Sequence, residues 1–133
     1  MIYVLDTNIV SQILKRHDAI RDKIETLAFE GHKIAISAIS YYEIKRGLIA
    51  AKAAAKLRKF EKLCTQFGLL LLDDREVFDV ASKIWADLKE RGQIVNDADI
   101  LIAASVRRIG AILVSHHKDF RRIPNLHLED WLD

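Results

Sequence analysis

The 133-residue sequence has few of the features that mark secreted, membrane-bound or multidomain proteins. Its single cysteine, Cys64, excludes an internal disulfide framework and is typical of a reducing compartment. The first residues lack the basic and apolar segments of a signal peptide, and no apolar run approaches the ~20 residues needed to cross a bilayer. The only proline is Pro124, and no linker-like stretch occurs. We therefore expect one domain, residues 1–133, in the cytoplasm, with no membrane partner.

The sequence also lacks the motifs of several enzyme classes. No cysteine and histidine cluster has zinc-ligand spacing, because Cys64 is alone and His116 and His117 are adjacent. No glycine-rich phosphate loop and no nucleophile elbow is present. These absences argue against zinc, nucleotide-binding and serine-hydrolase chemistry.

What the sequence does contain is an alternation of short apolar runs with amphipathic helical patterns. The apolar runs predict strands at 2–5, 33–37, 69–72, 111–114 and, briefly, 126–128. Helical periodicity and propensity predict helices at 8–17, 20–28, 40–47, 49–66, 77–88 and 98–108. Strands that alternate with helices favour parallel pairing. The predicted fold class is therefore α/β, a three-layer α/β/α domain with a central parallel sheet.

Acidic residues follow several of these predicted strands or open the helices behind them. In a parallel sheet such positions converge on one edge, where ligands bind outside the carboxyl ends of the strands. Carboxylates gathered there repel one another unless a cation lies between them, and Mg²⁺ prefers oxygen ligands. The candidate metal ligands are Asp6, Glu43, Asp97, Asp99 and Asp119.

Each acid also has a purely structural interpretation. Asp6 can cap the helix that follows it, and Ser40 with Glu43 fits a capping box. Asp97 and Asp99 suit the first turn of a helix, and Asp119 suits a turn. Taken together, the structural interpretations are less convincing than taken singly, because several independent caps would all have to fall at one end of one sheet. Nearby polar residues can either position Asp6 or a metal-bound water or serve as local caps; they are Thr7, Asn8 and Ser115.

On these residues the chain resembles the PIN-domain ribonucleases of the VapC toxin type. The resemblance rests on VLDTN at 4–8, SAISYYEI at 37–44, DILIAA at 99–104, LVS at 113–115 with Asp119-Phe120, and EDW at 129–131. It implies a PIN-like fold and a small endoribonuclease that depends on Mg²⁺ or Mn²⁺ and acts as the toxin of a type II toxin–antitoxin system. It also implies a homodimer, an RNA substrate, and a VapB-type antitoxin whose tail places an arginine or lysine near the acids.

The resemblance implies roles for single residues. Asp6, Glu43 and Asp99 match the three motif acids of the family and are the expected catalytic, metal-binding residues. Family members often carry aspartate or asparagine where this chain has His117, and Asp119 is the nearest carboxylate. We expect Asp97 or Asp119 to supplement the three acids. His117 is interpreted as a surface loop histidine, with a phosphate contact or proton shuttling as the alternative.

The expected reaction is hydrolysis of RNA by a metal-activated water, without a protein nucleophile. Basic clusters are either solvated helix faces or phosphate contacts, and the candidate RNA-binding residues are Lys45, Arg46 and Lys118. Apolar side chains nearby belong either to the core or to dimer or antitoxin contacts; they are Tyr41, Tyr42, Ile49 and Phe60.

Two other functions remain open. A degenerate PIN fold would bind RNA or a partner without cleaving, and the histidine at position 117 keeps this alternative alive. A phospho-receiver domain has similar length, but it needs an acidic pair after its first strand. Here Asp6 stands alone, and the pair Asp73-Asp74 comes after a later strand.

Overall fold

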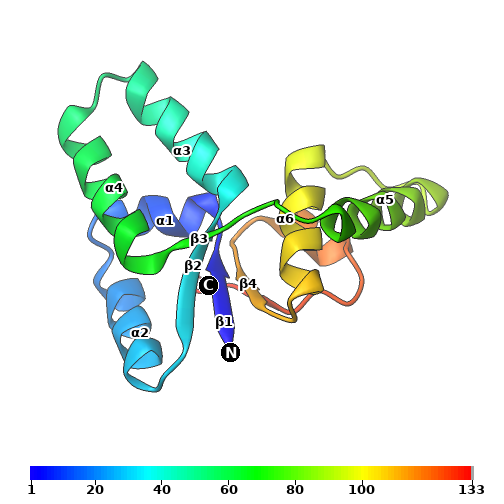
Figure 1. Ribbon diagram of the computed structural model, residues 1–133, viewed down its shortest axis with the longest axis horizontal. Coiled ribbons are helices and arrows are strands. Elements are labelled where there is room, and N and C mark those ends of the chain that lie inside the picture. Colours follow the sequence, from blue (N-terminus) through cyan, green and yellow to red (C-terminus); the bar gives the residue numbers. More distant parts are fainter. Residues whose placement is uncertain (133) are drawn as a thin grey trace.

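The computed structural model describes residues 1–132, which form a parallel β-sheet with helices packed on both faces (Figure 1). The strands are β1 (Ile2–Leu5), β2 (Lys33–Ser37), β3 (Leu69–Leu70), β4 (Ile112–Val114) and β5 (Leu128–Glu129). The helices are α1 (Thr7–Leu14), α2 (Asp18–Phe29), α3 (Ala38–Ala50), α4 (Ala54–Phe67), α5 (Arg75–Glu90) and α6 (Asp97–Arg108), with a 3₁₀ helix at Lys118–Arg122. The predicted α/β/α class with a parallel sheet is confirmed.

The order of the strands places β1 in the centre of the sheet. The order is β3-β2-β1-β4-β5, and every recorded pairing is parallel. Leu5, the last residue of β1, pairs with Ile36 of β2 and Val114 of β4. The residues that follow these three strand ends therefore meet at one edge of the sheet, at its centre.

Alternating side chains along β1 point into two separate cores. Val4 is fully buried among residues of α5 and α6, whereas Leu5 is fully buried among residues of α1 to α4. This alternation is the period of two that a strand buried on both faces requires. The two groups of helices lie on opposite sides of the sheet in Figure 1.

The predicted helices at 40–47 and 49–66 are wrong in their bounds. The first begins at Ala38, directly after β2, and runs through Gly47 to Ala50. The chain then turns through residues 51–53, with Lys52 at a positive φ of 54°, before α4 begins at Ala54. High helix propensity on both sides of the turn conceals it in the sequence. The reversal lets α4 pack back on α3, where Phe60 stacks on Tyr41 with ring centroids 5.6 Å apart.

None of the helices within residues 1–132 has both the length and the apolar character needed to cross a membrane.

Candidate active site

Three of the predicted acids line one pocket at the carboxyl edge of the sheet. The pocket has a volume of about 300 Å³, and its lining consists of Asp6, Thr7, Asn8, Glu43, Asn96, Asp99 and His117. These residues come from the end of β1, the start of α1, the first turns of α3, the start of α6 and the loop after β4. The topology brings them together, because the first residues beyond β1, β2 and β4 are neighbours.

Asp6 is buried and is held by two hydroxyl groups. Its side chain is 5% exposed, and it makes no capping hydrogen bond to α1. Ser40 Oγ donates to Asp6 Oδ1 at 3.1 Å, and Ser115 Oγ donates to Asp6 Oδ2 at 2.8 Å. These donors compensate part of the cost of burying the carboxylate, and they also fix its orientation.

Glu43 is oriented by the first residue of α1. Thr7 Oγ1 donates to Glu43 Oε1 at 3.0 Å. The alternative capping box of Ser40 and Glu43 is wrong, because α3 begins earlier and Ser37 caps it by accepting a bond from Ile39 N at 3.2 Å. The hydroxyl of Ser40 and the carboxylate of Glu43 are therefore both directed to the pocket side of the helix.

The surroundings of Asp99 shift the pKa of its carboxyl group. It lies in the first turn of α6, where Asn96 caps the helix and also donates from Nδ2 to Asp99 Oδ2 at 3.1 Å. Burial raises the pKa of the Asp99 carboxyl above its usual value, and the negative charge of Asp6 acts in the same direction. Contacts with His117 and Asn96 oppose that rise in pKa. The pocket therefore disfavours the ionised carboxylate until a positive charge enters.

His117 contacts the acids that the sequence interpretation had separated from it. Its Nδ1 lies 2.9 Å from Asp99 Oδ2 and its Nε2 lies 3.6 Å from Asp119 Oδ2, although the side chain is 44% exposed. Asp119 also forms an ion pair with Arg122 at 3.2 Å. His117 is thus an exposed loop residue, as expected, and its ring also contacts two of the acids.

The remaining supporting residues hold the loop after β4 in place. Ser115 Oγ accepts a hydrogen bond from His117 N at 3.0 Å while it donates to Asp6. Asn8 Oδ1 accepts from His116 N at 3.1 Å. Ser115 and Asn8 therefore tie the carboxyl end of β4 to the start of α1.

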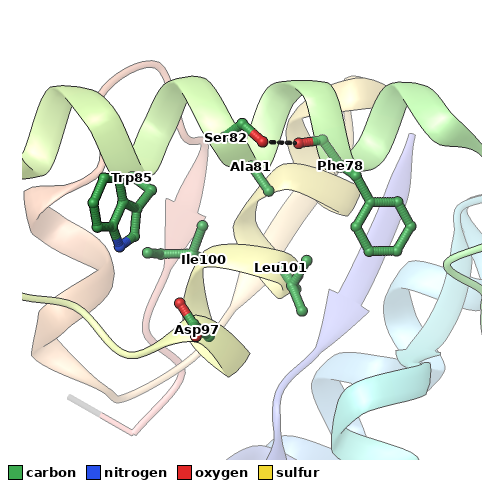
Figure 2. A pocket seen from close by; sticks show the side chains of 7 residues that line it. All are labelled: Phe78, Ala81, Ser82, Trp85, Asp97, Ile100 and Leu101. Atoms are coloured by element: carbon green, nitrogen blue, oxygen red, sulfur yellow. Dashed lines mark hydrogen bonds between the residues drawn. The ribbon is translucent and has the colours of Figure 1, made fainter.

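Asp97 does not line the acidic pocket, contrary to the expectation that it supplements Asp99. Residues two apart on a helix point about 200° apart, so the two side chains leave α6 on different sides. Asp97 instead borders a depression between α5 and α6, beside Trp85 and Ile100 (Figure 2).

The predicted RNA-binding residues are not among those that line the pocket. Lys45 Nζ donates to the Tyr41 hydroxyl at 2.9 Å and lies 3.5 Å from Glu61. Arg46 lies over the ring of Tyr42, 4.9 Å from its centroid. Lys118 is exposed at the start of the 3₁₀ helix.

Other residues have roles that the sequence interpretation missed. Ser40 was taken only as part of a capping box, and Asn96 was overlooked. The spacing of Asn96 and Asp99 is a recognisable cap signal, but it does not show that the amide also binds the Asp99 side chain. Phe60, by contrast, is fully buried and belongs to the core, so it cannot serve as a surface contact.

The donors in and beside the pocket fit a divalent cation. Asp6, Glu43 and Asp99 offer carboxylate oxygens, which hard divalent ions prefer. At one side, ligand atoms of Asp99, His117 and Asp119 all lie within 4.8 Å of one another. An octahedral ion with bonds of about 2.1 Å spans roughly 3 to 4 Å between its ligands, which is close to the spacing within the group of Asp99, His117 and Asp119.

Comparisons with known proteins identify the family and the fold. A family model described as PIN domain matches residues 3–126. The ribonuclease VapC2 of Rickettsia felis is 34% identical over 140 residues that cover 98% of each chain. The ribonuclease VapC1 of Haemophilus influenzae strain R2866 is 28% identical, also over 98% of each chain.

Two solved structures share the fold over nearly their whole length. One is VapBC2 from Rickettsia felis bound to a DNA fragment from its promoter, with a TM-score of 0.88 at 30% identity over 98% of this chain and 99% of that chain. The other is VapBC-1 from nontypeable Haemophilus influenzae, with a TM-score of 0.88 at 28% identity over 100% of both chains.

Proposed function

This chain belongs to the PIN-domain family, and from that premise we propose that it is a metal-dependent endoribonuclease, the toxin of a VapBC-type toxin–antitoxin module. The observation that carries the proposal is the convergence of Asp6, Glu43 and Asp99 on one pocket. The names of the relatives, which are ribonucleases, support the same activity.

We assign the binding of Mg²⁺ or Mn²⁺ to Asp6, Glu43 and Asp99, with His117 and Asp119 at the edge of the site. Such an ion, when bound, supplies Lewis acidity for the hydrolysis of a phosphodiester by water. The chain's own contribution is to hold three carboxylates in fixed orientations through Thr7, Ser40, Ser115 and Asn96. The residues assigned here include no protein nucleophile.

Cleavage and metal binding can be measured independently of each other. Purified protein is incubated with total RNA in Mg²⁺, in Mn²⁺ and in chelator, beside the Asp99→Asn variant. We expect cleavage only by the unaltered protein and only with metal. Cleavage that persists in chelator or in Asp99→Asn contradicts the proposal.

Thermal unfolding gives the readout that does not depend on activity. A ligand at 100 times its Kd stabilises the folded state by about 2.7 kcal/mol, which corresponds to a rise in Tm of roughly 10 °C for a domain of this size. We expect this rise with the unaltered protein and its loss in Asp99→Asn.

A second candidate is a PIN fold that binds RNA without cleaving it. It is favoured by one observation, the presence of the His117 ring beside Asp99 where relatives of this type often have an acid or amide. Binding of RNA with no metal-dependent cleavage in the same assay supports that candidate.

We propose a small VapB-type antitoxin as the protein partner. The two solved relatives described above are VapBC structures, and one of them is bound to DNA. A cationic side chain of the antitoxin, placed among Asp6, Glu43 and Asp99, would take the electrostatic position of the metal. Competition between antitoxin and Mn²⁺, followed by the Tm of the complex, tests this arrangement.

We also propose a homodimer, with its contact on the face formed by α5 and α6. Figure 2 shows Phe78 and Trp85 of α5 and Leu101 of α6 around the depression that Asp97 borders. Phe78 and Trp85 are 47% and 48% exposed, and a second depression continues along the face and shares Trp85 and Ile100. Two copies related by a two-fold axis can cover this strip with the same strip of the partner.

A further inference from the structure

A second polar groove lies on the other side of the sheet from α5 and α6, between α1, α2 and α4. It has a volume of about 380 Å³, and its lining includes the apolar residues Ile13 and Leu63. Its edges carry four cationic side chains from three segments of the chain, namely Arg16, Arg21, Lys59 and Lys62. No aspartate or glutamate is among the residues that line it.

The four cations of this groove have no carboxylate partner in the part of the chain that the structure describes. Within residues 1–132, no ion pair or hydrogen bond to a carboxylate is recorded for the side chains of Arg16, Arg21, Lys59 or Lys62. Lys45, on the neighbouring helix α3, differs because it pairs with Glu61 and Tyr41. Four like charges around one concavity repel one another, so an anion that enters the groove relieves the repulsion.

The cationic residues of the groove are carried by helices or tied to them by backbone hydrogen bonds. Arg16 follows the last turn of α1 and is held there by its N–H, which donates to Ile13 O at 3.0 Å. Lys59 and Lys62 are three residues apart on α4, so they project from the same face of that helix. The neighbouring Phe60 is fully buried and anchors α4.

Helix α1 connects the groove to the acidic pocket. Asp6 and Thr7 stand at its amino end and line the pocket, whereas Ile13 and Arg16 stand at its carboxyl end and line the groove. At 1.5 Å per residue, the seven residues from Asp6 to Ile13 span about 10 Å, roughly the length of three stacked nucleotides. An extended polynucleotide cut at the acids can therefore reach the cations a few phosphates away.

We propose that this groove binds the phosphodiester backbone of the RNA substrate beyond the site of cleavage. The inference rests on the proposed function and adds to it the path of the RNA along α1. Lysine and arginine side chains that contact only phosphates bind RNA independently of its nucleotide sequence. The groove therefore contributes affinity for long RNA, and a substrate too short to reach it is cleaved without its help.

The test compares two double variants with the same change in charge. Lys59→Gln with Lys62→Gln removes two cations of the groove, whereas Lys52→Gln with Arg58→Gln removes two from the same helical hairpin outside it. Binding of a labelled 20-nucleotide single-stranded RNA is measured by anisotropy between 0.1 and 1 M salt, without added metal. Two lost phosphate contacts reduce the salt slope by about 1.4, which is roughly a 25-fold loss of affinity at 0.1 M salt.

We expect this loss of RNA affinity only for Lys59→Gln with Lys62→Gln. Cleavage of a four-nucleotide RNA by the same variant should be unchanged. Equal losses in both variants, or no loss in either, overturn the inference. Unchanged RNA affinity together with a weaker complex with the antitoxin also overturns it, and assigns the groove to a protein partner. The proposed function is judged separately by cleavage of the four-nucleotide RNA, since this requires the acids and not the groove.

Discussion

Asp99 and His117 are in direct contact, with 2.9 Å between a carboxylate oxygen and Nδ1 of the imidazole. The contact joins the first turn of α6 to the loop after β4. It places a nitrogen donor at the edge of a pocket whose other ionisable lining groups are carboxylates.

This mixed donor set predicts a preference for Mn²⁺ over Mg²⁺. Imidazole is a suitable ligand for transition metals, whereas Mg²⁺ favours oxygen donors. In His117→Asp we expect the ratio of Mn²⁺ affinity to Mg²⁺ affinity to fall by about tenfold. Competition between the ions, read from the electron paramagnetic resonance of bound Mn²⁺, measures the ratio. His117→Gln serves as the control. An unchanged ratio of Mn²⁺ to Mg²⁺ affinity in His117→Asp shows that the imidazole does not bind the metal.

Asp99→Asn is expected to stabilise the metal-free protein while it abolishes cleavage. Because burial raises the pKa of Asp99, the ionised carboxylate costs stability at neutral pH, and an amide avoids that cost. The cost is absent below the unfolded pKa of about 4, where both states are protonated, and it is fully present above the folded pKa.

The Tm of Asp99→Asn should therefore exceed that of the unaltered protein at pH 7, and the gap should narrow toward pH 4. We expect no metal-dependent cleavage by this variant. Unfolding curves at several pH values in chelator measure the gap. A variant that is less stable at pH 7 shows instead that the contacts with His117 and Asn96 outweigh the cost of burial.

Ser115→Ala tests the positioning of Asp6. The substitution removes one of the two hydroxyl donors of a buried carboxylate, so we expect a loss of about 1.5 to 3 kcal/mol of stability. Metal affinity should fall by about 10- to 100-fold, the usual effect of losing a group that orients a ligand. Ser82→Ala is the matched control, because Ser82 Oγ donates only to Phe78 O on an exposed face. Equal metal affinity in the two variants counts against the role of Ser115.

Trp85→Arg tests the proposed dimer contact. A charged side chain at the centre of the apolar strip leaves a desolvated charge in the interface, so we expect a monomer at concentrations where the unaltered protein is dimeric. Phe29→Arg is the control, since Phe29 is 93% exposed on α2, across the sheet from that face. Sedimentation analysis of both variants measures their oligomeric state. If Trp85→Arg remains a dimer, the dimer contact lies elsewhere.

Local sequence patterns were sufficient to predict much of the fold. Alternation of apolar runs and helical stripes predicted a parallel sheet flanked by helices, because each strand of such a sheet is buried on both faces. The break between α3 and α4 was predicted too early, near residue 48, since residues 49–66 favour a helix throughout; the turn lies instead at 51–53, and Phe60 of α4 stacks on Tyr41 of α3.

The sequence by itself determined which acids stand behind the strands. Asp6 directly follows β1, and the helix that carries Glu43 directly follows β2, so chain connectivity and parallel pairing bring both to one edge. Tertiary structure alone decided that Asp99 faces the pocket and Asp97 does not, because the rotation of α6 about its axis is set by packing against the sheet and α5. It also decided that side chains as distant in sequence as Arg16 and Lys62 share one groove, since only the folded chain brings their helices together.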